Sequence, residues 1–151
     1  MTYLRILLPQ NLIRSKFTDP RAQNGSPFYP PLLPMKNFDI SHHTYPLYDI
    51  LELKGELDAH TSPRLEEALQ RLLREQRNRI IVNCRDLQYI ASAGLGVFMA
   101  YIEEVREKGG DIKLTNMNDQ VYNVFDLLGF PSLYDIFKDV SEAVNDFTLK
   151  A

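Results

Sequence analysis

Apolar residues recur along the chain at two spacings, which indicate strands and helices in turn. The short apolar run Ile80–Cys84 contains β-branched residues and predicts a buried strand. After it, apolar residues recur three and four positions apart, which is the spacing of an amphipathic helix. This series predicts a helix that ends at the glycine pair 109–110, and it consists of Leu95, Phe98, Met99, Ile102 and Val105.

The same patterns predict further strands and helices on both sides of this pair. A serine followed by proline at 62–63 predicts a helix start, with Ser62 as N-cap and Pro63 as the first helical residue. Two more helices are predicted from Asn118 or Asp119 to Gly129 and over 141–147. The additional strands are predicted at 38–45, 47–53, 112–115 and 133–137.

Strands that alternate with helices predict an α/β fold with crossover connections. We therefore expect a single small domain with a mixed, mostly parallel β-sheet and about four helices. Pro46 limits pairing beside the first strand, so that strand is expected at an edge of the sheet, and Gly55 is expected to end the first strand pair. A chain of 151 residues with 44% hydrophobic residues is large enough to bury one core.

The first 34 residues differ in composition from the rest. They contain one acidic residue against four basic ones, and six of the nine prolines: Pro9, Pro20, Pro27, Pro30, Pro31 and Pro34. Successive prolines remove backbone donors and restrict their neighbours, which prevents a helix. We expect residues 1–35 to form a disordered Pro-rich tail before a domain at 36–151. The change directly before Met35 also raises the hypothesis that Met35 is the native start.

Charge and cysteine content narrow the function classes. A formal net charge of -3 and a pI near 5.6 provide no basic footprint for nucleic acid. The single cysteine, Cys84, allows no internal disulfide and fits a reducing compartment, where we expect it as a small core residue. No run approaches the roughly 18 apolar residues of a membrane span, and a cytoplasmic protein is expected.

Ser92 is the main candidate for chemistry. It lies between the central strand and the helix that follows, with small neighbours at 91, 93 and 94. A hydroxyl there is expected to be exposed, beside unpaired N–H groups that favour a negative group. The simpler alternative is an ordinary N-cap serine.

Three catalytic or binding alternatives are weaker. Asp58, His60 and Ser92 all follow strands and could meet as a triad, but Ile90 occupies the first glycine position of a nucleophile elbow. Gly94 and Gly96 lack the third glycine of a dinucleotide fingerprint. The adjacent histidines 42 and 43 point to opposite faces of a strand, which does not favour a metal site. We expect no enzyme, cofactor or metal.

Several motifs occur together in a specific order. They are Gly55-Glu-Leu-Asp58 with His60-Thr61, then Asp86-Leu-Gln-Tyr-Ile-Ala-Ser92-Ala-Gly-Leu-Gly96, and later Val124-Phe-Asp-Leu-Leu-Gly129. In this order they resemble the STAS domain of anti-sigma factor antagonists, from about Phe38 to the C-terminus. The resemblance implies a small α/β protein that binds an anti-sigma factor serine kinase and so frees the sigma factor. The kinase, with its own bound ATP, phosphorylates the antagonist and ends binding, and a serine phosphatase restores it.

Carried onto this chain, the resemblance makes Ser92 the phosphoacceptor and places partner contacts at Asp58, Thr61, Ala93, Gly94 and Leu95. Asp58 has an equally simple alternative as a turn or capping carboxylate. Family members often have Asp or Ser where this chain has Ala91, which changes the hydrogen bonding beside the acceptor. Neither nucleic acid nor membrane is an expected direct partner. The alternative function is a STAS scaffold or ligand-binding module in another signalling or transport assembly.

Overall fold

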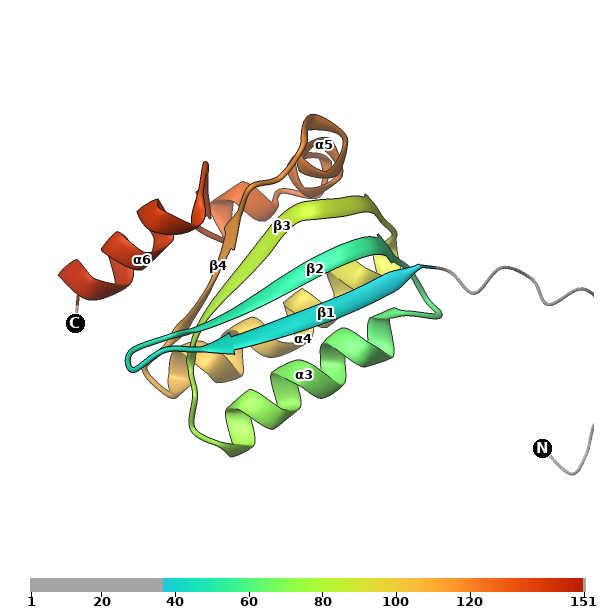
Figure 1. Cartoon of the computed structure of the whole chain (residues 1–151). Coiled ribbons are helices and arrows are strands. Elements are labelled where there is room, and N and C mark those ends of the chain that lie inside the picture. Colours follow the sequence, from blue (N-terminus) through green and yellow to red (C-terminus); the bar gives the residue numbers. More distant parts are fainter. Residues whose placement is uncertain (1–36, 151) are drawn as a thin grey trace, which may run out of the picture. The chain divides into compact units, whose positions relative to one another are not determined.

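The computed structural model describes residues 37–150, which form a five-stranded sheet in the order β1-β2-β3-β4-β5 (Figure 1). The predictions for residues 1–35 therefore lie outside the described residues. The strands are β1 (Phe38–Thr44), β2 (Asp49–Leu57), β3 (Arg79–Ile90), β4 (Asp111–Thr115) and β5 (Ile136–Phe137). The first pair is antiparallel and the other three are parallel, so the mixed sheet and the edge position of β1 are confirmed.

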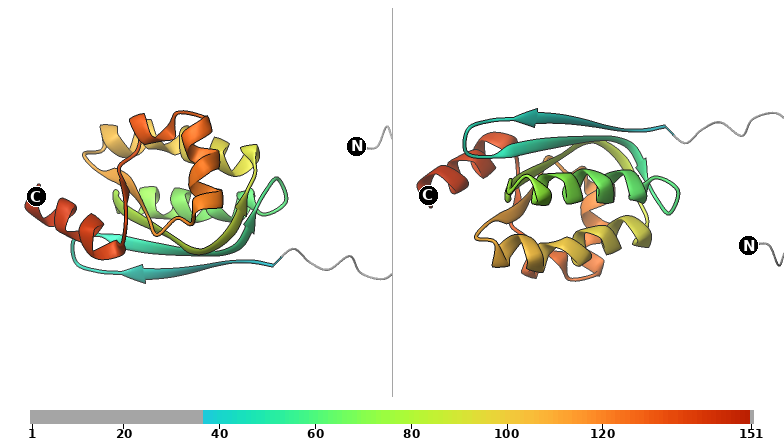
Figure 2. Two further views of the ribbon diagram at one scale, coloured as in Figure 1. Left: turned by 90° about the horizontal axis from the view of Figure 1, so that it is seen from above. Right: turned by 90° about the horizontal axis from the view of Figure 1, so that it is seen from below.

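Helices cover both faces of the sheet. They are α3 (Ser62–Arg74), α4 (Ser92–Glu107), α5 (Asp119–Leu127) and α6 (Val140–Leu149), with a short 3-10 turn η2 (Phe130–Ser132) before β5. Helices α3 and α4 lie side by side against one face, and α6 lies against the other (Figures 1 and 2). None of the helices in this described segment combines the length and apolarity needed to cross a bilayer.

Alternation along the strands divides the core into two clusters. In β2 and β3, Leu51 and Val82 point into the larger cluster under α3, α4 and α5, whereas Ile50 and Ile81 point into the smaller one under α6. Successive residues of a strand face opposite sides, so both clusters follow from the same apolar runs. Cys84 is fully buried in the larger cluster. Burial raises the pKa of its thiol to about 12, which keeps it protonated and confirms its expected role as a core residue.

Strands β2 and β3 both end later in the chain than predicted. Gly55 ends the pairing with β1, opposite Phe38, but β2 continues to Leu57 against β3. The predicted central strand, Ile80–Cys84, was too short, because β3 continues to Ile90. Leu87 and Ile90 are buried, and this half of β3 pairs with the end of β2 across a register shift. Such a bulge cannot be read from apolar spacing alone.

Helix starts agree with prediction to within one residue. Thr61, rather than Ser62, is the N-cap of α3, and the proline that follows lies in the first turn. Asn118 caps α5, because its side chain accepts a hydrogen bond of 2.8 Å from the Val121 N–H. The apolar stripe of α3 is buried throughout, and it consists of Leu65, Ala68, Leu69, Leu72 and Leu73.

Close packing at Gly94 fixes the start of α4. A Cβ atom built on Gly94 would lie 2.7 Å from Cγ of Leu57 and 3.1 Å from Cγ1 of Ile90. Leu57 has no exposed surface, so it has little room to move aside. Only glycine lets the first turn of α4 come this close to the ends of β2 and β3.

A buried lysine holds α6 against the sheet. Lys113 in β4 is 2% exposed, and its ammonium group lies 2.5 Å from Asp146 and 3.0 Å from Asp135. The ammonium also lies 4.8 Å from the ring centroid of Phe147 in α6. The hydrogen bond from Lys113 lowers the pKa of Asp146, so this carboxylate is charged at neutral pH.

We expect Gly94→Ala to lower the free energy of unfolding by about 1–3 kcal/mol, because the added methyl group overpacks against Leu57. Gly96→Ala is the matched control in the same helix, since a Cβ there has no neighbour within 4 Å. The control should be neutral or stabilising by up to about 1 kcal/mol. Urea unfolding measures both, and equal stabilities of the two variants would contradict the close contact at Gly94.

We expect Asp146→Asn to destabilise the protein by about 1–2 kcal/mol at pH 7, because it removes a charged partner of the buried Lys113. The folded-state pKa of Asp146 is depressed, so its stabilisation is complete above the unfolded pKa of about 3.9 and is lost as pH falls through the folded pKa. The difference between wild type and variant should therefore shrink below about pH 4. Denaturant unfolding between pH 3 and 7 tests this, with the exposed Asp126→Asn in α5 as control. A difference independent of pH would contradict the ion pair.

Candidate functional site

Ser92 is the first residue of α4, directly after the end of β3, and its side chain is exposed. The N-cap is Ala91, whose extended backbone (φ -102, ψ 169) turns the chain from strand to helix. The Ala91 carbonyl accepts the N–H groups of Gly94 and Leu95, at 3.0 and 3.3 Å. Ser92 is therefore one position inside the helix and is not the capping residue, so the simpler N-cap alternative is wrong in detail.

The first turn of α4 has no side-chain cap. Backbone N–H groups at the start of a helix generally have no intrahelical acceptor, and in this turn the Gly94 N–H is an exception because it bonds the Ala91 carbonyl. Ala91 has no side-chain oxygen to accept from them, whereas an Asp or Ser at that position would have one. The N–H groups beside the Ser92 hydroxyl thus remain suited to an anion attached to that hydroxyl.

The loop from β2 to α3 lies beside this turn and is held together by Asp58 and Thr61, which are 5% and 7% exposed. Oδ1 of Asp58 accepts hydrogen bonds from the N–H groups of His60 and Thr61, at 2.8 and 3.2 Å. In return, Oγ1 of Thr61 accepts from the Asp58 N–H at 2.8 Å and donates to the Glu56 carbonyl at 2.8 Å. The carboxylate of Asp58 therefore organises the turn, which is the structural alternative for this residue.

One backbone hydrogen bond joins the two loops. The Ala91 N–H donates to the Leu57 carbonyl at 2.9 Å, and Leu57 pairs with Ile90 in the sheet. The residue before the Asp58–Thr61 turn is thereby tied to the residue before Ser92. The predicted site residues from the two loops meet at the carboxyl edge of the parallel strands, where ligands and partners of α/β sheets commonly bind.

The site residues differ in what they present to the surface. Ser92 is exposed and Ala93 is partly exposed, whereas Gly94 and Leu95 are buried, with Leu95 3% exposed. The two buried residues set the position of the helix and do not offer side chains to a partner. The importance of Gly94 for this position could be suspected from its place in the motif, but its contact with Leu57 needs the tertiary structure.

Asp58, His60 and Ser92 do not form a catalytic triad in the structure. His60 is exposed on the loop, and no hydrogen bond within residues 37–150 joins its imidazole to the Ser92 hydroxyl. A serine nucleophile needs a base within hydrogen-bond reach. His60 instead donates its backbone N–H to Oδ1 of Asp58.

The two adjacent histidines occupy separate surroundings, as their strand positions predicted. His42 Nε2 lies 2.9 Å from Asp49, and His43 Nε2 lies 3.6 Å from Glu52. Among the described residues, no group of three or more histidine, cysteine or acidic side chains is arranged to hold a metal ion.

Comparison with known proteins agrees with this geometry. The STAS domain family matches residues 40–143. The anti-sigma F factor antagonist of Paenibacillus polymyxa is 30% identical over 112 residues, which are 72% of this chain and 92% of that protein. The anti-sigma-B factor antagonist of Bacillus subtilis (strain 168) is 34% identical over 86 residues, or 57% of this chain and 78% of that protein.

Solved structures share the fold at lower identity. An anti-sigma factor antagonist from Mycobacterium paratuberculosis has a TM-score of 0.69 at 15% identity, covering 74% of this chain and 95% of that one. The Bacillus cell fate determinant SpoIIAA in its phosphorylated form has a TM-score of 0.58 at 21% identity, and the match covers 73% of this chain and 98% of that one. The sheet order, the matched residues and these relatives lead to one conclusion: the chain belongs to the STAS domain family, among the anti-sigma factor antagonists.

Proposed function

We propose that this protein is an anti-sigma factor antagonist, which binds an anti-sigma factor serine kinase, releases the sigma factor, and is switched off by phosphorylation of Ser92. The observation that carries the proposal is the exposed Ser92 hydroxyl on the uncapped first turn of α4. The relatives named as antagonists of anti-sigma factors support the choice of partner. The STAS fold of SpoIIAA is known in a phosphorylated form, which supports its tolerance of the modification.

The chemistry is supplied by the partner. Oγ of Ser92 attacks the γ-phosphorus of ATP bound to the kinase, and the bond from that phosphorus to the β,γ-bridging oxygen breaks to leave ADP. The hydroxyl proton passes to a base of the kinase. A serine phosphatase later hydrolyses the phosphoester and regenerates the hydroxyl. This chain contributes an accessible acceptor, and position and exposure are what the reaction requires of it.

A phosphate on Ser92 adds about -1.5 to -2 charges and three acceptor oxygens at neutral pH. Beside the first turn of α4, the helix dipole stabilises this charge by roughly 0.3–1 kcal/mol at an exposed position. In a packed interface the same charge must be desolvated without a partner, which weakens binding by several kcal/mol. The modification thus changes the association and leaves the fold of the monomer intact.

The remaining partner-binding residues have different roles in this proposal. Ala93 is partly exposed and can touch the partner, since its small side chain lets another surface approach the helix start. Gly94 and Leu95 are buried and contribute by fixing the position of α4 against the sheet. Asp58 and Thr61 hold the adjacent loop in shape, so that its exposed residues Ala59 and His60 are presented beside Ser92.

We expect incubation with the cognate anti-sigma kinase and ATP to add one phosphate, at Ser92, as measured by intact mass and peptide mass spectrometry. Ser92→Ala should remain unmodified. Ser141→Ala is the matched control, because Ser141 is also an exposed serine in the first turn of a helix, α6, and this variant should be phosphorylated like wild type. A phosphate that persists in Ser92→Ala would show that another residue is the acceptor.

We also expect Ser92→Asp to weaken binding to the unphosphorylated kinase by about 30-fold or more, since a buried unpaired carboxylate costs about 2–5 kcal/mol at an interface. Ser92→Ala should bind within about threefold of wild type, because it introduces no charge. Isothermal titration calorimetry measures both, and Ser141→Asp controls for charge elsewhere on the surface. Equal affinities of the Ser92 variants would refute the charge mechanism.

A further inference from the structure

The two halves of helix α4 differ in surface chemistry. The first half, residues 92–101, contains no charged residue, whereas the second half, residues 102–107, includes three glutamates and an arginine. Four residues of the uncharged half are exposed to solvent: Ser92, Gly96, Met99 and Ala100. The surface of α4 around the proposed phosphorylation site is therefore uncharged, although it is not covered by the rest of the domain.

Helix α3 lies beside α4 and has the surface of an ordinary solvated helix (Figure 2). Charged residues normally occupy the solvent-facing side of such a helix. In α3 they make up most of that side, and its exposed residues are Pro63, Arg64, Glu67, Gln70, Arg71 and Arg74. The core of a protein–protein interface is instead depleted of charge and enriched in methionine. The exposed side of the first half of α4 has the second kind of composition.

Gly96 has no explanation within the fold. When a Cβ atom is built on this residue, nothing in residues 37–150 lies within 4 Å of it, in contrast to Gly94. Its φ is not in the left-handed region that would require glycine. A glycine inside a helix is destabilising relative to alanine, because it loses more backbone entropy on folding. The domain therefore gains no stability from glycine at position 96, and the open space above it is available to a partner.

Gly96 and Met99 lie on the same side of α4 as Ser92, four and seven residues further along the helix. A rise of 1.5 Å per residue places them about 6 Å and about 10 Å from Ser92 along the helix axis. A standard protein–protein interface covers roughly 800 Å² of each partner, which corresponds to a circular patch of about 16 Å radius. A patch of this size around Ser92 includes both residues.

Met99 is the large apolar side chain within this distance on the exposed side of α4, and it is 47% exposed. Methionine is unbranched and flexible, so it can fill an irregular recess on another protein. Beyond it, the charged second half of the helix begins. This order matches the usual arrangement of an apolar interface core beside a polar rim.

From these features we infer that the kinase docks along this side of α4, with Gly96 as the point of closest approach and Met99 as an apolar anchor. The inference rests on the proposed function, because the kinase is the partner that has to reach the Ser92 hydroxyl. The absence of a side chain at position 96 lets the kinase surface contact the helix backbone one turn beyond Ser92. Met99 then packs into an apolar recess of the kinase.

The test is isothermal titration calorimetry of the full-length protein with the unphosphorylated cognate kinase. We expect Gly96→Leu to weaken binding at least about tenfold, because the added side chain occupies the space of the partner. Met99→Ala should weaken binding at least about fivefold, and Met99→Leu should restore most of the affinity. The matched controls, Asn145→Leu and Leu149→Ala, are at exposed positions of α6 on the other face of the sheet, and should bind within about twofold of wild type.

Urea unfolding of the same variants separates a partner contact from a role in the fold. Gly96→Leu should be at least as stable as wild type, since leucine favours a helix more than glycine does. Its affinity and its stability are therefore expected to change in opposite directions. A parallel loss of stability and affinity would assign Gly96 to the fold and overturn the inference.

Unchanged affinity in Gly96→Leu or in Met99→Ala, or an equal loss in the α6 controls, would also overturn the inference. These results would leave the proposed function standing, because wild type would still bind the kinase. A wild-type protein that does not bind the kinase would overturn the proposed function, and the inference would fall with it.

Discussion

The close approach of α4 to the ends of β2 and β3 determines how this protein presents its functional surface. Gly94 packs against Leu57 at a distance that leaves no room for a side chain, and the Ala91 N–H bonds the Leu57 carbonyl. These two contacts fix the axis and the first residue of the helix. Ser92 is exposed as a consequence, since the buried side of that first turn is taken by Gly94 and Leu95.

In the same arrangement, the residues that stabilise the fold are different from Ser92, the proposed site of phosphorylation. Asp58 and Thr61 are buried, and their hydrogen bonds hold the turn between β2 and α3. A phosphate on Ser92 would therefore meet solvent and backbone N–H groups, and no buried side chain of the core has to move. A switch of this kind acts on association with a partner because the stability of the monomer depends on other contacts.

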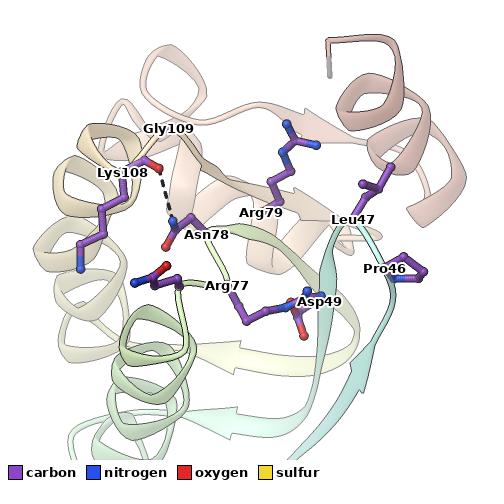
Figure 3. Close-up of a pocket in the computed structure, with 9 residues that line it drawn as sticks. Pro46, Leu47, Asp49, Arg77, Asn78, Arg79, Lys108 and Gly109 are labelled. Atoms are coloured by element: carbon purple, nitrogen blue, oxygen red, sulfur yellow. Dashed lines mark hydrogen bonds and ion pairs between the residues drawn. The ribbon is translucent and has the colours of Figure 1, made fainter.

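The opposite face and edge of the sheet are built by different means. Helix α6 is held by a charged group: Lys113 reaches from the sheet to the carboxylate of Asp146, and its ammonium lies over the ring of Phe147. At the amino edge, Arg77 neutralises the buried Asp49, and both residues line a pocket together with Arg79 (Figure 3). The two edges thus differ in chemistry: a hydroxyl at a helix start on one, and positive charge around a recess on the other.

Local sequence patterns were sufficient for the strands, the helices and the edge position of β1, because apolar spacing and turn residues act within a few positions of each other. They also placed Ser92 at a helix start, and the motif order identified the family. Tertiary structure decided the rest. The extension of β3 to Ile90 depends on pairing across a bulge, the roles of Asp58 and Thr61 depend on which donors surround them, and the pocket at Arg79 is lined by three segments distant in sequence. Spacing along one segment cannot report contacts whose partners are supplied by another.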